Sequence, residues 1–264
     1  MRKNRLKEKL LKGKSILGIW QSINSMDLAE MSGYSGYDFI IFDTEHGSMS
    51  AESCIPLICA AERTDVIPII RVSEIQKTYI LKALDVGAMG IIFPMVKTLE
   101  DAIKAVSLSR YIQREEEKTE QFRGLINVSR AAGYGITIDS KTHIKTSNEE
   151  IMLIVQLETR EAVSNLDEIL KIEEIDVVFI GAFDLSQSLG FPGEVNNPMV
   201  KNIIEDAIKK ILNSGKVAGV LIESTDSLKY WMELGVKFFT CHQTVILTKA
   251  LGNFINNFNK VIHG

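Results

Sequence analysis

The stretch KTYILKALDVGAMGIIFPMV, Lys77–Val96, decides how this chain is expected to fold. Its first half has apolar residues at helical spacing and ends at Gly87, and its second half, MGIIFPMV, has the composition of a strand buried on both faces. A helix that leads directly into such a strand is typical of parallel sheets, because two parallel strands need a crossover between them. The stretch therefore predicts one unit of an α/β fold.

The same unit recurs along the chain. Helical patterns cover residues 25–33, 51–64, 77–87, 99–112, 160–172 and 197–215. Eight expected strands alternate with helical segments, which predicts a single (β/α)₈ TIM barrel. An open doubly wound sheet is less consistent with the sequence, because GIWQSINS, at the end of the first strand, lacks a glycine-rich phosphate turn. The expected strands are SILGIW (15–20), YDFIIF (37–42), VIPIIRV (66–72), MGIIFPMV (89–96), IMLIVQLE (151–158), DVVFIGAF (176–183), VAGVLIE (217–223) and KFFTCH (237–242).

We expect one domain over residues 1–264, with an amphipathic N-terminal helix over about 2–13 and an extended loop over about 114–148. A net charge of −4 predicts no nucleic-acid partner, and no apolar run has the roughly 20 residues that cross a bilayer. The three cysteines, Cys54, Cys59 and Cys241, form no CxxC pair, and the basic N-terminus lacks an apolar signal core. A reducing, cytoplasmic location is expected.

Two carboxylates stand at the ends of neighbouring expected strands. Glu158 closes one strand and Asp184 follows the next, so their side chains should lie about 5 Å apart on one face of the barrel. Carboxylates that close repel unless a proton or a cation lies between them, and an oxygen-rich site favours Mg²⁺ or Mn²⁺. The alternative is that each acid caps the following helix, in ETRE and DLSQ.

The segment FDTEHG, Phe42–Gly47, carries a further candidate group. His46 is the natural acid/base because histidine titrates near neutral pH, and Asp43 is placed to orient it. Arg71 ends an otherwise apolar strand, so it should face a carboxylate or an oxyanion. A structural salt bridge from Arg71 to Asp43 or Glu45 is the competing interpretation.

Several segments, in this order, resemble the HpcH/HpaI aldolase family, from about Gly18 to Leu251. They are GYDFIIFDTEHG, IPIIRV, LKALDVGAMGIIFPMV, FRGLINVSRAAGYG, IVQLETREAVSNLDEI and DVVFIGAFDLSQSLG. The family comprises metal-dependent aldolases of 2-oxo acids, such as 4-hydroxy-2-oxoheptanedioate and 2-dehydro-3-deoxyglucarate aldolases. The resemblance implies a TIM barrel of the phosphoenolpyruvate/pyruvate-binding type and a homo-oligomer, a trimer or hexamer, assembled by exchange of the last helix.

The resemblance also implies roles for individual residues. Glu158 and Asp184 match the metal ligands, with Mg²⁺ or Mn²⁺ expected and Co²⁺ as a further option. His46 matches the catalytic base, with Asp43 beside it, and Arg71 matches the group that holds the pyruvyl oxygen. The remaining substrate-binding positions are Gln156, Gly181, Ala182, Phe183 and Asp184, of which the last four would bind the substrate carboxylate.

The expected function is that of a class II aldolase, which reversibly cleaves a 4-hydroxy-2-oxo acid to pyruvate and an aldehyde through a pyruvate enolate. One alternative is a related lyase that acts on an acyl-CoA ester, like citrate or malyl-CoA lyase, and another is a non-catalytic binding protein. A Schiff-base aldolase would need Lys97, although KTLED is typical of a helix start. Departures from the family at GAFDLS (181–186) and CHQT (241–244) predict a different aldehyde side of the pocket.

Overall fold

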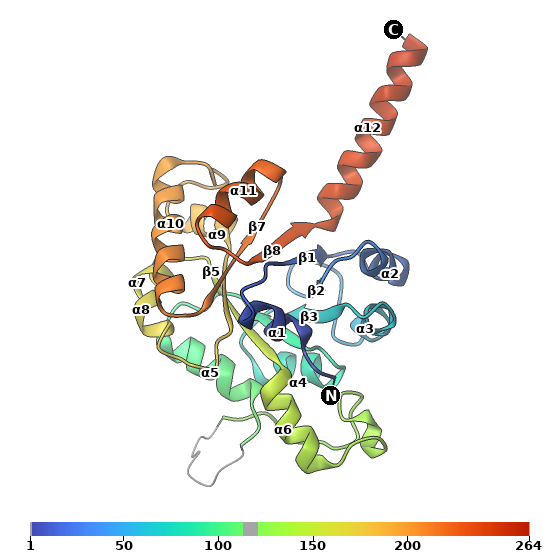
Figure 1. Cartoon of the computed structure of the whole chain (residues 1–264), viewed down its shortest axis with the longest axis vertical. Helices are drawn as coiled ribbons and strands as arrows, with labels where there is room; N and C mark the ends of the chain where they lie inside the picture. Colours follow the sequence, from blue (N-terminus) through green and yellow to red (C-terminus); the bar gives the residue numbers. More distant parts are fainter. Residues whose placement is uncertain (1, 113–120, 264) are drawn as a thin grey trace.

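Eight parallel strands close into a barrel in sequential order, as the sequence predicts (Figure 1). The computed structural model describes residues 2–112 and 121–263. Neighbouring strands pair in parallel all the way round, and β1 closes the barrel against β8. The strands are β1 (Ile16–Gln21), β2 (Phe39–Asp43), β3 (Ile67–Arg71), β4 (Gly90–Phe93), β5 (Met152–Leu157), β6 (Val177–Ile180), β7 (Val217–Leu221) and β8 (Phe238–His242).

Helices alternate with these strands and most of them surround the barrel, whereas α12 projects away from it (Figure 1). The expected helix over 160–172 is divided at Asn165, which ends α7 and begins α8. Among the described residues, no helix is both long and apolar enough to cross a membrane. The helices are α1 (Arg5–Leu11), α2 (Met26–Tyr34), α3 (Cys54–Arg63), α4 (Lys77–Asp85), α5 (Leu99–Ser109), α6 (Ser140–Glu150), α7 (Arg160–Ser164), α8 (Leu166–Ile169), α9 (Ala182–Ser188), α10 (Pro198–Asn213), α11 (Thr225–Glu233) and α12 (Gln243–His263).

Two apolar layers hold the barrel together. One lies between the strands and the surrounding helices, and the other fills the barrel interior with aromatic and β-branched side chains. In the interior, the Phe39 and Phe238 rings lie 4.5 Å apart between centroids. Gly18 makes room for this packing, since a Cβ there would lie 2.0 Å from the Phe39 ring. The interior is thus a packed core, and function is confined to the ends of the strands.

Three strands end two or more residues earlier than the sequence predicts. β6 ends at Ile180 rather than at residue 183, β7 ends at Leu221 rather than at 223, and β4 ends at Phe93 rather than at 96. The apolar character of each run continues after the ladder has ended, so composition could not locate the last paired residue. After β6 the chain turns at once into α9, which places Asp184 on a helix rather than on a strand.

The N-terminal helix and the long connection after α5 differ in detail from expectation. α1 is shorter than residues 2–13, and its N-cap Asn4 donates to the Met89 carbonyl (2.9 Å), which ties the helix to the start of β4. The charge run at 114–120, with which the expected loop begins, lies outside the described residues. The end of that loop is helical, because Asp139 caps α6 and the helix buries His143 and Ser147, four residues apart.

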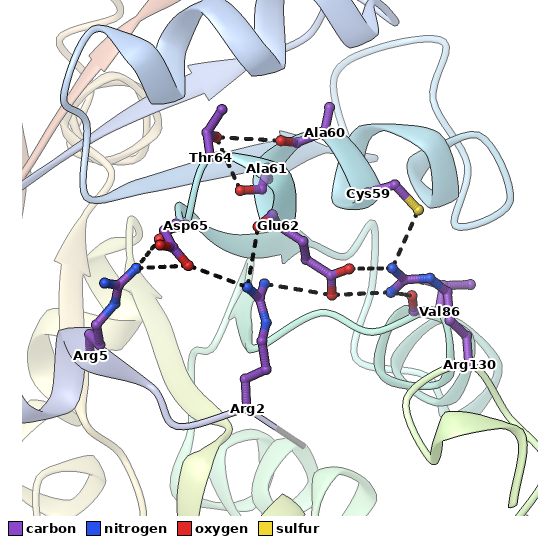
Figure 2. A network of polar contacts seen from close by, with 10 residues as sticks. All are labelled: Arg2, Arg5, Cys59, Ala60, Ala61, Glu62, Thr64, Asp65, Val86 and Arg130. Carbon is purple, nitrogen blue, oxygen red and sulfur yellow. Dashed lines mark hydrogen bonds and ion pairs between the residues drawn. The ribbon is translucent and has the colours of Figure 1, made fainter. Parts of the chain in front are cut away.

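A polar network anchors the segment before α6 (Figure 2). Arg130 donates to the Glu62 carboxylate (2.5 Å) and to the Val86 carbonyl (3.1 Å). Arg2 forms an ion pair with the same Glu62 carboxylate. Arg123 pairs with Asp85 at the end of α4 (3.0 Å). Since α3 and α4 end where the following strands begin, these contacts hold the described part of the segment at the end of the barrel opposite the strands' carboxyl ends.

Candidate active site

A cavity of about 660 Å³ lies at the carboxyl ends of the strands. All but one of the predicted site residues line it, and Glu158 lines a second cavity that shares Asp184 with the first. The structure therefore brings the predicted set together around one end of the barrel. The predicted residues in the main cavity are Asp43, His46, Arg71, Gln156, Gly181, Ala182, Phe183 and Asp184.

Arg71 is held by two carboxylates and one aromatic ring. It is 7% exposed and sits opposite Asp43 in the β2–β3 register. Its Nε and Nη2 donate to the two Asp43 oxygens (2.9 and 2.5 Å), and its Nη1 lies 2.9 Å from Glu45. The guanidinium also lies 4.6 Å from the Trp20 ring centroid. The salt bridge considered from the sequence is therefore present, and it fixes Arg71 in the cavity wall.

Asp43 organises this wall in a way that the sequence did not show. Burial opposes its ionisation, but the hydrogen bonds and charge of Arg71 outweigh burial and lower the Asp43 pKa. Its Oδ1 also accepts the backbone N–H groups of Glu45 (3.0 Å) and His46 (3.2 Å). Asp43 thus positions His46 through the backbone of the turn, while its two oxygens face Arg71 instead of the imidazole.

Glu158 is a buried carboxylate with an unusual proton affinity. It is 2% exposed, its Oε1 accepts the Met95 N–H (2.5 Å) and its Oε2 accepts Gln156 Nε2 (2.9 Å). Burial raises the Glu158 pKa to about 7; the Met95 N–H opposes this rise, and the charges of Glu45 and Asp184 add to it. At neutral pH, a cation beside Glu158 would therefore displace a proton.

The capping interpretation of the two acids does not describe their positions. Thr159, not Glu158, caps α7, because its side chain accepts the Ala162 N–H (3.1 Å). Gly181 is the N-cap of α9, and Asp184 lies exposed in that helix's first turn. Neither carboxylate is therefore used as a helix N-cap.

Gly181 is required by the close approach of Glu158. A Cβ at this position would lie 2.7 Å from Glu158 Oε2 and 2.8 Å from Glu158 Cβ. The absent side chain leaves a space beside the buried carboxylate, at the junction of β6 and α9. Any larger residue would displace Glu158 from this position.

The donor set around Glu158 fits a hard divalent cation. Within residues 2–112 and 121–263, no cluster of three or more His, Cys, Asp or Glu side chains is placed to hold a metal. Glu158 and Asp184 instead offer two carboxylates, and the buried Gln156 Oε1 has no hydrogen-bond partner among the described residues. One or two carboxylates, with water or substrate in the remaining positions, is the usual protein contribution to a Mg²⁺ site.

Lys97, which a Schiff base would require, does not line the main cavity. Its backbone N–H donates to Asp101 (3.0 Å) next to a capping box between Thr98 and Asp101, which confirms KTLED as a helix start. Its side chain belongs to the second cavity, and no lysine lines the main cavity among the residues that the structure describes.

Trp20 and His242 are among the lining residues to which the sequence assigned no role. Trp20 lies at the end of β1, where an aromatic residue resembles core, and its Nε1 donates to Thr240 (2.9 Å). His242 ends β8 with its ring 5.7 Å from that of Trp20. Burial, followed by the charge of Arg71, lowers the His242 pKa. The sequence places His242 at the end of a strand, but only the strand register shows that this position faces the cavity.

Comparison with known proteins agrees with this geometry. A model of the HpcH/HpaI aldolase/citrate lyase family matches residues 17–239. The 2-keto-3-deoxy-L-rhamnonate aldolase of Escherichia coli O9:H4 (strain HS) is 37% identical over 236 residues, which cover 89% of this chain and 85% of the relative.

Solved structures show the same likeness. An HpcH/HpaI aldolase/citrate lyase family protein from Burkholderia cenocepacia J2315 superposes with a TM-score of 0.90 at 26% identity, over 97% of this chain and 99% of the other. Citrate synthase SbnG superposes with a TM-score of 0.86 at 31% identity, over 98% and 99% of the two chains. The aldolase resemblance found in the sequence is confirmed, and this chain belongs to the HpcH/HpaI aldolase/citrate lyase family.

Proposed function

We propose that this aldolase uses a divalent cation at Glu158 and Asp184, with Mg²⁺ or Mn²⁺ preferred, to cleave a 4-hydroxy-2-oxo acid reversibly into pyruvate and an aldehyde. The observation that carries the proposal is the position of Arg71, which Asp43 and Glu45 hold in the cavity wall. A buried guanidinium faces the same cavity as His46 and Asp184, next to a carboxylate whose pKa is raised to about 7. A site of this kind suits a reaction in which negative charge develops on a substrate oxygen.

Arg71 has donors left for that oxygen. A guanidinium carries five N–H groups, and the contacts with Asp43 and Glu45 engage one each on Nε, Nη2 and Nη1. The remaining N–H groups can meet the 2-oxo oxygen of pyruvate as it gains charge. Because both carboxylates hold the guanidinium in place before substrate arrives, no reorganisation is needed during the reaction.

The other residues complete the binding of the 2-oxo acid. The amides of Ala182, Phe183 and Asp184 belong to the first turn of α9, where N–H groups have no intrahelical acceptor, so they suit the substrate carboxylate. The side chain of Gln156 lines the same wall. When bound, the divalent cation would supply Lewis-acid stabilisation of the enolate charge.

His46 is the proposed acid/base. It lies exposed on the turn after β2 and lines the cavity, so a substrate can reach it. In the cleavage direction it would take the proton of the 4-hydroxyl group. In the direction of aldol addition it would take a proton from the pyruvate methyl group. The pyruvate enolate carries the electrons of the broken C3–C4 bond, and Arg71 would stabilise its charge until C3 is protonated.

The test uses pyruvate alone. Loss of the methyl proton signal in D₂O is followed by NMR with Mg²⁺ or Mn²⁺, then with EDTA, for the wild type and for His46→Ala. We expect exchange that EDTA abolishes and a rate in the variant lower by about 10² to 10⁴. Lys97→Ala is the control, since a Schiff base would make exchange survive EDTA and depend on Lys97. No exchange in the wild type would refute the proposed function.

A second copy of the chain is the proposed partner of α12. This helix points away from the barrel and makes few contacts with it (Figure 1). Leu251 is 70% and Phe254 77% exposed, with Phe258 and Val261 on later turns also exposed. Apolar side chains displayed in this way along a helix are normally covered by a partner, which supports a homo-oligomer, a trimer or hexamer.

A further inference from the structure

Met95 has a backbone conformation that its residue type rarely adopts. Its φ is 54°, in the left-handed region, where the Cβ of a non-glycine residue is crowded. Among the described non-glycine residues with positive φ, Asp65 and Tyr134 line neither cavity at the strand ends, whereas Met95 lines the second one. A strained residue persists only where its surroundings hold it, and such residues are frequent at functional sites.

The chain is anchored on both sides of Met95. Before it, Phe93 ends β4 and is in register with the neighbouring strand β5. After it, the Lys97 N–H donates to the Asp101 carboxylate (3.0 Å), and the Lys97 carbonyl accepts from Asn165 Nδ2 (2.9 Å). The connection between these two anchors is short, so its backbone has little freedom to relax.

Packing of the Met95 side chain does not account for the conformation. Pro94 and Val96 are buried, but Met95 between them is 44% exposed. A buried side chain could hold a strained backbone in place through its contacts, whereas this one lines the open second cavity. The conformation instead sets the direction of the Met95 backbone N–H.

The Met95 N–H and the Gln156 side chain both hold the Glu158 carboxylate. Met95 donates to Oε1 (2.5 Å) and Gln156 Nε2 donates to Oε2 (2.9 Å). Contacts on the two different oxygens fix the plane of the carboxylate, and each oxygen keeps a further lone pair for a cation. The space that Gly181 leaves by having no side chain adjoins Oε2. The carboxylate is thus oriented by its protein donors.

Resting on the proposed function, we propose that Met95 is a positioning residue, whose left-handed backbone aims its N–H at Glu158 and holds this carboxylate in place for the divalent cation. Hydrogen bonds that orient a metal-ligating side chain contribute to metal affinity. The role belongs to the backbone, so it depends on whether the residue at position 95 can adopt a positive φ. Glycine adopts it readily, an unbranched side chain tolerates it, and a β-branched side chain does not.

Titration calorimetry with Mn²⁺ alone compares the wild type with three variants at this position. Met95→Val should weaken Mn²⁺ binding by about tenfold or more, because its branched Cβ turns the N–H away from Glu158. Met95→Gly and Met95→Leu should bind within about threefold of the wild type, because both retain the backbone conformation. Met31→Val is the matched control, since Met31 is exposed on α2 and lines neither cavity.

A second measurement needs no variant and no metal. Hydrogen exchange of the Met95 amide, followed by NMR of the metal-free wild type, should be at least about 100-fold slower than in an unstructured peptide. Rapid exchange would overturn the inference, as would equal Mn²⁺ affinities of Met95→Val and Met95→Gly. Wild-type protein that binds Mn²⁺ in either case would leave the proposed function intact. Failure of the wild type to bind Mn²⁺ would instead remove the proposed cation, and this inference with it.

Discussion

Replacing Glu158 with glutamine should stabilise the metal-free protein at neutral and alkaline pH. The folded protein buries this carboxyl beside two other acids, and it holds the proton up to a pKa of about 7, against an ordinary value of 4.5. Glutamine has nearly the same shape and carries no charge. Gln156 can accommodate it, because its buried Oε1, which has no hydrogen-bond partner among the described residues, can turn to accept from the new amide.

The direction of the effect follows from the two pKa values. Below pH 4.5 the carboxyl is protonated in both the folded and the unfolded chain, so its burial adds no pH dependence. Between pH 4.5 and 7 the unfolded chain loses the proton and the folded chain keeps it, so the free energy of unfolding falls as pH rises. Each pH unit costs about 1.4 kcal/mol, which makes about 3 kcal/mol over this window.

Urea denaturation in EDTA, followed by circular dichroism from pH 4.5 to 8, measures this difference. Wild-type stability should decline relative to that of Glu158→Gln by up to about 3 kcal/mol across the window, and other titrating groups cancel in the comparison. Glu161→Gln, an exposed carboxylate on α7 that lines the same second cavity, is the control. At pH 8, Mn²⁺ should restore stability to the wild type and not to Glu158→Gln.

The reasoning would be refuted by parallel pH profiles for the wild type and Glu158→Gln. Such a result would mean that Glu158 ionises normally in the folded protein, and the argument for a cation beside it would lose its electrostatic basis. Equal stabilisation of the two proteins by Mn²⁺ would place the metal elsewhere.

Three further changes test separate parts of the site and its assembly. Arg71→Lys removes the paired hydrogen bonds to Asp43, and cleavage should slow by at least about 100-fold in a steady-state assay; a near-wild-type rate would show that Arg71 has only a structural role. Gly181→Ala should displace Glu158 and weaken Mn²⁺ binding by about tenfold or more in titration calorimetry, so unchanged affinity would contradict Glu158 as a ligand. Serine at Leu251, Phe254 and Phe258 together should reduce the mass of the assembly in light scattering, and an unchanged mass would show that α12 is not the interface.

The barrel was predictable because its signal is repeated. Each strand has a buried composition and each helix an amphipathic one, so eight weak indications point to the same architecture. The ends of the elements were less predictable. The segment after Ile180 continues the apolar run of β6, yet it forms α9 with Gly181 as its N-cap. The composition does not change there, so the sequence did not indicate the start of this helix.

The sequence placed the candidate residues at the ends of the strands, but it could not show their contacts. Strand-end spacing places Asp43 and Arg71 side by side, and the register confirms that they face each other. The same spacing could not show that Asp43 bonds to the backbone of His46 instead of its ring. It also left His242 without a role, since a histidine at a strand end acquires one only through the rings and charges that surround it.

The charges of the site explain why Arg71 can be a structural and a functional residue at once. With Asp43 and Glu45 it forms a group of net negative charge, and Glu158 stays partly protonated at neutral pH beside it. A divalent cation would let Glu158 ionise next to Asp184 and would reduce the net negative charge of the whole site. The enolate then adds one further negative charge, and the remaining N–H groups of Arg71 are the donors fixed in place to meet it. The two carboxylates therefore hold the guanidinium in place and leave N–H donors free. The proposed catalytic role depends on this salt bridge, because it fixes those donors before substrate binds.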